Sequence, residues 1–454
     1  MTSLRTSLRT LSIVAITSLV AGTLATTATA QADSLGARNA QMENAWQPTS
    51  EAAFDSDGLS WRSLMDAQGR GTVFSGGKYR DYRVETGRLS AARTLARGDV
   101  ILRVDGIGRG HQCATWDGDF GVAMGCRAST SAPWVKVNVS RASDAEVIDV
   151  AVAADGRTAM VVWARTSRGK ANVYASRFTF ARGRLAAPVA LSNPVARRLP
   201  LTTDVVASGS SGFLVAYGTQ GSQRGRVAST YIQSTVDGRS WTPRTEVLLA
   251  PPGGDPAPVA LTDLSHDGTG VAALATRDVS SATGASEWML ASFQDGRFTA
   301  VDEVPSMRRP QLAIVGEAMT IVGASPSSED LIVYAPGTGA EGMIAHPTIP
   351  EGSARLGEFD IVGQTSADGT PGFTVTAAYY AYDDADDQVD RLYAASGFPD
   401  ASGAWDISRL LELTSRASYE EGMGPRLAGS GRYAMVVYAA NTEVAFGVRS
   451  PAST

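Results

Sequence analysis

The sequence predicts an all-β fold, a β-propeller of seven or eight four-stranded blades whose ring is closed by the N-terminal segment. Three observations support this prediction. Turn glycines recur about every fifty residues, which is the spacing of propeller blades. Four short strand-like runs follow one another in the same order within a unit, and the start of the folded chain resembles a fourth strand that the last unit lacks. One short interval between glycines leaves both seven and eight blades open.

The repeat is defined by glycines that each lie between two strand-like runs. The clearest unit contains residues 147–152, 159–163, 172–178 and 183–185. Its second run is apolar throughout, which is typical of a strand buried on both faces. A parallel α/β fold would need long helices between the strands, and only residues 407–420 are suited to one. The turn glycines are Gly69, Gly106, Gly156, Gly209, Gly268, Gly316, Gly369 and Gly429.

The two ends of the chain complement each other. After Pro425 only three strands are predicted, whereas residues 46–51 resemble residues 241–246 at the fourth-strand position of another unit. We therefore expect residues 44–55 to complete the last blade together with residues 425–450. Such closure removes an exposed sheet edge. Residues 31–454 are then a single propeller domain.

The first thirty residues have the features of a secretory signal peptide. Two arginines precede the apolar stretch 11–25, and Ala28-Thr29-Ala30 provides small residues for cleavage. A transmembrane helix is the alternative, but polar and small residues interrupt a stretch that is already short for a span. We predict cleavage after Ala30, which gives a secreted, extracellular protein with no membrane span in the mature chain.

Composition excludes one class of partner. The 454 residues include 40 Lys and Arg against 46 Asp and Glu, a net charge of −6. Binding to nucleic acid depends on clustered basic residues that contact phosphates, so no nucleic-acid partner is expected. The chain is 43% hydrophobic and 19% charged, which is typical of a folded protein.

The two cysteines flank a turn-rich segment. Pairing the runs on either side of residues 116–121 as a hairpin places Cys113 opposite Cys126. We therefore predict a cross-strand disulfide, as expected in an oxidising compartment. Two free thiols are the alternative. A zinc site is disfavoured because two cysteines supply only half of the four ligands that zinc takes.

Residues 234–241, Ser-Thr-Val-Asp-Gly-Arg-Ser-Trp, resemble the Asp box (BNR repeat) of sialidase-like propellers, and residues 56–61 are a weaker copy. In both segments the Asp directly precedes the Gly, which departs from the usual pattern. The resemblance implies a carbohydrate-binding propeller in which this Asp caps a turn. It would also imply three arginines, a Tyr–Glu nucleophile and an Asp acid, but the expected Phe/Tyr-Arg-Ile-Pro stretch is absent. No catalytic residue is assigned.

Other catalytic patterns are also missing. His111, His266 and His346 lack partner motifs, and the sequence contains neither Gly-x-Ser-x-Gly nor His-Glu-x-x-His. The sequence therefore favours a non-enzymatic function: a secreted propeller that recognises a ligand or serves as an interaction scaffold, with a polysaccharide or an extracellular protein as partner. The alternative is a glycan-active hydrolase or lyase; as an enzyme it would be a glycoside hydrolase.

Loops between second and third strands all lie at one end of a propeller, and loops are where binding residues concentrate. These loops therefore supply the candidate ligand-binding residues: Arg165, Arg168, Lys170, Arg224, Arg226, Tyr380 and Tyr382.

An acidic segment in the same set of loops is the candidate metal site. Asp383, Asp386 and Asp390 offer the hard oxygen ligands that suit Ca²⁺. The glycine and terminal glutamate of an EF-hand loop are absent, and a solvated loop is the alternative. No cofactor other than Ca²⁺ is suggested.

Overall fold

The computed structural model describes residues 46–48, 53–55, 61–107, 110–118, 121–167, 170–192, 195–196, 203–219, 229–250, 254–266, 270–278, 286–382, 388–417, 424–440 and 443–449. The predicted signal peptide, residues 1–30, lies outside them. Within these ranges no helix has the length and the apolar character that crossing a membrane requires.

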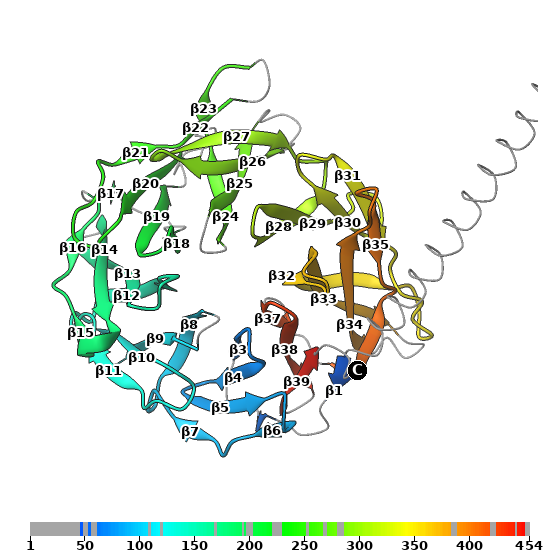
Figure 1. The fold of residues 1–454 in the computed structure, drawn as a ribbon, viewed down its shortest axis with the longest axis horizontal. Coiled ribbons are helices and arrows are strands. Elements are labelled where there is room, and N and C mark those ends of the chain that lie inside the picture. Colours follow the sequence, from blue (N-terminus) through cyan, green and yellow to red (C-terminus); the bar gives the residue numbers. More distant parts are fainter. Residues whose placement is uncertain are drawn as a thin grey trace, which may run out of the picture.

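Eight antiparallel blades surround a central axis (Figure 1). In each blade the first strand lies innermost, and later strands follow outward. The first four blades contain β3 (Trp61–Met65), β4 (Arg70–Ser75), β5 (Lys78–Arg83) and β6 (Arg88–Leu89); β8 (Val100–Gly106), β9 (Gln112–Gly118), β10 (Gly121–Arg127) and β11 (Val135–Asn138); β12 (Ala145–Val152), β13 (Thr158–Ser167), β14 (Lys170–Thr179) and β15 (Arg184–Leu185); β18 (Thr203–Ser208), β19 (Gly212–Thr219), β20 (Ser229–Thr235) and β21 (Thr245–Glu246).

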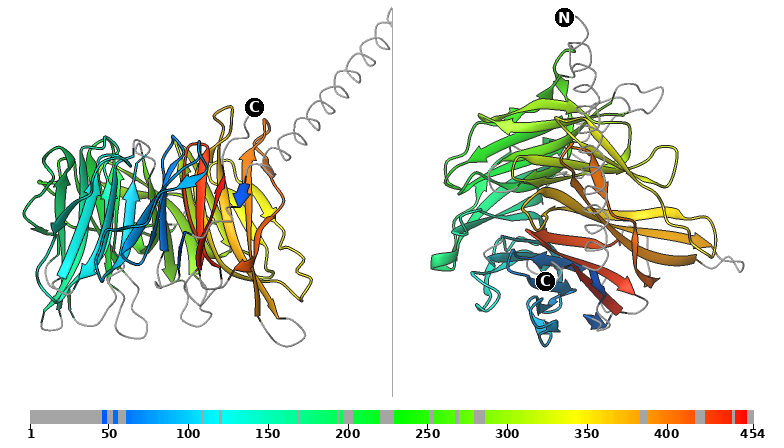
Figure 2. Two further views of the ribbon diagram at one scale, coloured as in Figure 1. Left: turned by 90° about the horizontal axis from the view of Figure 1, so that it is seen from below. Right: turned by 45° about the vertical axis from the view of Figure 1, so that its right-hand side comes forward.

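The second half of the ring follows the same plan, and its strands run from one end of the ring to the other (Figure 2). Blades 5 to 8 contain β24 (Ala260–His266), β25 (Val271–Asp278), β26 (Ser286–Gln294) and β27 (Arg297–Glu303); β28 (Arg308–Val315), β29 (Ala318–Ala324), β30 (Leu331–Ala335) and β31 (Ala340–Ile344); β32 (Arg355–Thr365), β33 (Pro371–Tyr382), β34 (Gln388–Pro399), β35 (Trp405–Ile407) and β36 (Leu411–Ala417); β37 (Arg426–Ser430), β38 (Tyr433–Ala440) and β39 (Glu443–Arg449).

Short elements complete the description. The strands β7 (Arg93–Thr94), β16 (Val189–Ala190) and β17 (Val195–Ala196) pair with the third strands of their blades. The strands β22 (Leu248–Leu249) and β23 (Ala257–Pro258) form a separate two-stranded sheet between blades 4 and 5, and Phe180–Arg182 is a 3₁₀ helix.

The N-terminal segment closes the ring. The strands β1 (Trp46–Pro48) and β2 (Phe54–Asp55) both pair antiparallel with β39, and Trp46 lies opposite Arg449. Trp46 is buried among apolar residues of blades 7 and 8, including Leu392 and Val436. The predicted closure is therefore confirmed, and the number of blades is eight.

The predicted turn glycines are largely correct. Five of the eight, Gly69 among them, have positive φ, a backbone conformation that favours glycine. Two were wrong: Gly106 and Gly429 lie within the inner strands β8 and β37. The following turns instead contain Gly110 (φ 87°) and Gly431 (φ 58°). Gly268 lies outside the described residues.

The segment considered for a helix is a strand. Of residues 407–420, Leu411–Ala417 form β36, which pairs with β34. Edge pairing within blade 7 therefore overrides local helix propensity, which is a weak determinant by comparison.

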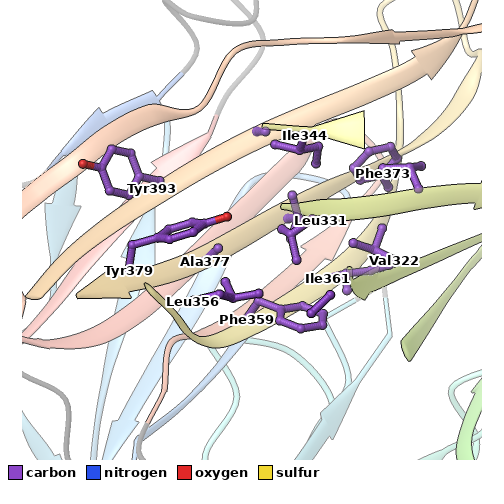
Figure 3. Packing of buried hydrophobic residues seen from close by; sticks show 14 of the residues in the cluster. Val322, Leu331, Ile344, Leu356, Phe359, Ile361, Phe373, Ala377, Tyr379 and Tyr393 are labelled. Carbon is purple, nitrogen blue, oxygen red and sulfur yellow. The ribbon is translucent and has the colours of Figure 1, made fainter. Parts of the chain in front are cut away.

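The core lies between neighbouring blades, as the apolar second strands predicted. Val322 and Leu331 of blade 6 and Phe373 of blade 7 are fully buried in one cluster (Figure 3). Each second strand packs against both adjacent blades, so both faces are apolar. Among the described residues the buried apolar side chains form eight clusters, one between each pair of neighbouring blades.

The predicted disulfide is confirmed. Cys113 and Cys126 are bonded across β9 and β10, with a Cα–Cα distance of 4.2 Å. The register is the expected one, with Thr115 opposite Met124 and Asp117 opposite Val122.

Candidate functional site

Each inner strand places a polar side chain at a corresponding position around the axis. We call these eight residues the axial ring. Each is half-buried or exposed, so solvent reaches them. In blade order from β3 to β37, they are Arg62, Arg103, Asp149, Asp204, Asp263, Gln311, Asp360 and Arg426.

Hydrogen bonds to the next blade show that these positions are equivalent. Asp149 accepts a hydrogen bond from the backbone N–H of Val205 at 3.0 Å, the residue after Asp204. Asp263 accepts one from Leu312, the residue after Gln311, at 2.8 Å. Asp360 accepts one from Leu427, the residue after Arg426, also at 2.8 Å. The side chain at each of these three positions therefore links its inner strand to the next one.

Other members of the axial ring make the same link with the opposite polarity. Gln311 donates from Nε2 to the carbonyl of Phe359 at 2.8 Å, directly before Asp360. Arg62 donates from Nε to the carbonyl of Leu102 at 3.2 Å, directly before Arg103. At these five positions the link between blades is thus made either by a donor or by an acceptor.

Irregular pairing in the inner strands accompanies the axial ring. The register between first and second strands shifts between Ile101 and Arg103, between Val147 and Asp149, and between Leu261 and Asp263. Blades 6 and 7 have similar shifts in β28 and β32. Such bulges bend a strand and re-aim the side chains beside them. We infer that they turn the axial-ring side chains toward the axis.

The charges of the axial ring are sorted by sign. Blades 8, 1 and 2 contribute three arginines, the arginine arc: Arg426, Arg62 and Arg103. Blades 3, 4 and 5 contribute three aspartates, the aspartate arc: Asp149, Asp204 and Asp263. Gln311 and Asp360 lie between the two arcs in blades 6 and 7.

Around Arg62, the positive charges of the arginine arc outnumber the nearby carboxylates. Burial, followed by the positive charges of Arg426 and Arg103, lowers the pKa of Arg62 to about 10. Of the charges that act on Arg62, only the carboxylate of Asp360 raises this pKa. Arg62 stays charged at neutral pH, and an anion bound beside it would relieve the repulsion.

Three carboxyls of the axial ring have a pKa above the usual range. Burial raises the pKa of Asp263 and that of Asp360 to about 6. The pKa of Asp204 is raised by burial and then by the charge of Asp149. Asp105, two residues beyond Arg103 on β8, has a pKa of about 7 because of its burial. Its carboxyl accepts the N–H of Val152 at 2.6 Å.

Several ring residues lie at the end of the molecule where second and third strands are connected. Inner strands begin at that end, and Arg62, Asp204 and Arg426 stand at or next to their starts. Arg165 lies opposite Ala145, the first residue of β12. Arg165 therefore lies at the same end of the molecule.

The predicted basic residues are only partly described. Arg165 forms an ion pair with Asp144 at 2.8 Å, so its charge already has a partner. Lys170 begins β14. Arg168, Arg224 and Arg226 lie outside the described residues, and their role stays a prediction.

The predicted aromatic pair is brought together. Tyr380 and Tyr382 stand at the end of β33 with ring centroids 6.1 Å apart. Tyr382 is 47% exposed, and Tyr380 lies opposite Arg355 at the start of the inner strand. Both tyrosines therefore lie toward the end of the ring where inner strands begin.

The predicted metal residues are not assembled within the described part of the chain. Asp390 is buried and accepts a hydrogen bond from Gln388 at 2.7 Å. Asp383 and Asp386 lie outside the described residues. Among the residues that are described, no group of three or more His, Cys, Asp or Glu could hold a metal ion. Calcium binding stays a prediction.

The segment that resembles an Asp box has the expected capping geometry. Asp237 accepts hydrogen bonds from the N–H groups of Ser240 at 2.9 Å and Arg239 at 2.7 Å, which lower its pKa. Trp241 packs against the core between blades 3 and 4. Residues 56–60 of the weaker copy lie outside the described residues.

Sequence reasoning missed the axial ring, although a signal was present. Asp204, Asp263 and Gln311 each stand five residues before an aligned turn glycine and directly before an aliphatic residue. A polar side chain at the same place in successive inner strands indicates a role at the axis.

No protein-family model matches the chain, and no curated protein sequence matches it. Among solved structures it is similar to the Dos1 propeller, with a TM-score of 0.51 and 9% identity over 89% of this chain and 96% of that one. The β-propeller domain of the Trilobed protease from Pyrococcus furiosus has a TM-score of 0.43 and 11% identity over 79% and 95%. An ulvan lyase has a TM-score of 0.42 and 9% identity over 80% of this chain and 97% of that one. The likeness to the Dos1 propeller shows the fold, a β-propeller.

Proposed function

We propose that the chain is a secreted, non-catalytic recognition protein that binds an acidic polysaccharide at the axial ring. One observation carries the proposal. The link between blades is made by the carboxyl of Asp263, the amide of Gln311 and the guanidinium of Arg62, so the fold does not require a charge there. The charges are nevertheless sorted into two arcs.

An acidic saccharide matches both arcs. Its carboxylate or sulfate would contact the guanidinium groups of Arg62, Arg103 and Arg426, since arginine binds planar anions through paired hydrogen bonds. Its hydroxyl groups would donate to the carboxylates of the aspartate arc. Tyr380 and Tyr382 would flank a longer chain. A neutral saccharide would leave the arginine arc without an anion.

Calorimetric titration tests the proposal. The ligands are an oligomer of galacturonate and a neutral cello-oligosaccharide of equal length. Arg62→Gln keeps a side chain able to make the Gln311-type link but removes the charge. We expect about tenfold weaker binding of the galacturonate oligomer, as for loss of a charged hydrogen bond. Arg157→Gln is the matched control, because Arg157 lies in the β12–β13 turn at the opposite end and is 85% exposed.

Two outcomes would overturn this function. Equal affinity for the acidic and the neutral oligomer would show that the arginine arc does not select an anion. Unchanged affinity of the Arg62→Gln protein would place the site elsewhere. Capture of an extracellular protein instead, lost in the same variant, would keep the site and replace the ligand.

A glycan-active enzyme is the second candidate, and Asp105 is the observation that favours it. A carboxyl with a pKa of about 7 can exchange a proton near neutral pH, as a general acid must. Mass spectrometry of the galacturonate oligomer after long incubation distinguishes the two functions. Cleavage that Asp105→Asn abolishes would establish the enzyme; an intact oligomer supports recognition alone.

A further inference from the structure

A pocket of about 570 Å³ lies away from the axis, between the outer strands of blades 6 and 7. Trp405 of β35 donates from Nε1 to the carbonyl of Ala340 in β31 at 3.3 Å, which holds the two outer strands together. Beyond this contact the outer strand of blade 7 is broken between β35 and β36. Residues 408–410 of the break and residues 345–348 after β31 line the pocket.

The apolar part of the pocket is aliphatic. Ile344, Ile407 and Leu410 line it, and Met343 at the rim is 63% exposed. Tyr393 also lines the pocket but is only 4% exposed. Its ring lies beside that of Tyr379 (Figure 3). The described lining therefore offers a place for an aliphatic side chain and no open aromatic face on which a sugar ring could stack.

One charged group at the pocket has no ion-pair partner within the described part of the chain. Glu412 is bound by Arg391 at 3.0 Å, and Arg391 also binds Glu351. His346 is held by Asp330 through Nδ1 at 2.7 Å. Arg409, by contrast, is exposed and makes no ion pair with any residue in the described ranges. The pocket therefore combines an aliphatic cavity with one available positive charge.

The strand break also leaves backbone groups available. The N–H groups of Arg409 and Leu410 lie outside β35 and β36 and have no hydrogen-bond partner among the described residues. Backbone donors need a partner, and an extended peptide supplies carbonyl or carboxylate oxygens. The class of ligand that matches cavity, charge and donors together is a peptide C-terminus that follows an aliphatic residue.

We propose that this pocket captures the C-terminus of a partner protein that ends in an aliphatic residue. The aliphatic side chain enters the cavity beside Ile344 and Leu410, and the terminal carboxylate contacts the guanidinium of Arg409. This site is separate from the axial ring and does not depend on the function proposed for it.

Fluorescence polarisation tests the proposal with a labelled hexapeptide that ends in leucine, used as the free acid and as the amide. We expect saturable binding of the free acid and about tenfold weaker binding of the amide, since the amide lacks the charge. Arg409→Gln should remove this preference. Arg88→Gln is the matched control, because Arg88 is an exposed arginine on the outer strand of blade 1.

Contrary results with the peptide overturn the peptide site and leave the function proposed for the axial ring untouched. Equal binding of acid and amide would exclude carboxylate recognition. No saturable binding, or full affinity in the Arg409→Gln protein, would exclude the peptide site. If galacturonate binding were lost in Arg409→Gln and kept in Arg62→Gln, the pocket would be a saccharide site instead.

Discussion

The arginine arc and the aspartate arc occupy the same position of the inner strand in consecutive blades, yet they differ in charge and in the direction of the hydrogen bond. Asp149 accepts an N–H from blade 4, whereas Arg62 donates to a carbonyl of blade 2. Both bonds join neighbouring inner strands. Five of the eight axial-ring residues make this bond, some as acceptors and some as donors, so the bond itself does not fix the charge at this position.

The largest expected effect comes from removing the segment that completes blade 8, which carries Arg426 of the arginine arc. Deletion of residues 31–55 removes β1 and β2 and exposes the edge of β39 and the apolar surroundings of Trp46. We expect a loss of several kcal/mol of stability, because burial of one large side chain alone contributes roughly 3–5 kcal/mol. Thermal unfolding measures it.

Deletion of residues 31–45, which keeps β1 and β2, is the control for this experiment. It should unfold close to the temperature of the intact protein. If both deletions had the same melting temperature, closure by β1 and β2 would not stabilise the ring.

The pH dependence of stability should distinguish the two arcs. Folding raises the pKa of Asp263 to about 6, so the folded state binds this proton more tightly than the unfolded state does. Its contribution is full below about pH 4 and is lost as the pH rises through about 6. Asp263→Asn keeps an acceptor for Leu312 and removes the charge. We expect a gain of about 1–2 kcal/mol at pH 8 and none at pH 4.

Urea unfolding at both pH values measures this difference. Asp263→Ala, which also removes the acceptor for the Leu312 N–H, should be destabilised at both values by about 1–3 kcal/mol. Arg62→Gln should show no such pH dependence over this range. A stability of Asp263→Asn that parallels the unmodified protein from pH 4 to pH 8 would refute the raised pKa.

The smallest expected effect concerns an arginine outside both arcs. Arg165 is about half exposed and paired with Asp144. Exposed ion pairs contribute roughly 0–1 kcal/mol, so Arg165→Gln should change stability by less than about 0.5 kcal/mol. Galacturonate affinity should change by less than about twofold, because this charge is already compensated. A loss as large as that in Arg62→Gln would extend the site to the loops.

Local sequence signals predicted much of the fold. The apolar run 159–163, the hairpin around residues 116–121 and the fourth-strand character of residues 46–51 each depend on neighbours in the chain. These three segments correctly predicted the buried second strand β13, the Cys113–Cys126 disulfide and the closing strand β1. Where local signals compete, the tertiary structure decides: residues 411–417, which are suited to a helix by themselves, form a strand because β34 offers an edge.

The candidate sites depend on residues that are distant in the sequence. Arg426 lowers the pKa of Arg62 only because closure brings blade 8 beside blade 1. The pocket of Arg409 exists because a strand of blade 7 breaks beside the end of β31. Neither arrangement has a local sequence pattern that would reveal it.

The sequence by itself determined the strand order, the disulfide and the closure, since these follow from turn chemistry, polarity alternation and the matching of the two chain ends. Only the tertiary structure decided which polar residues face the axis. The reason is physical: the direction of a side chain depends on how its strand pairs, with bulges in five of the eight inner strands, and electrostatic coupling depends on distance in space. The sorting of charge around the ring therefore becomes visible only when all eight blades are assembled.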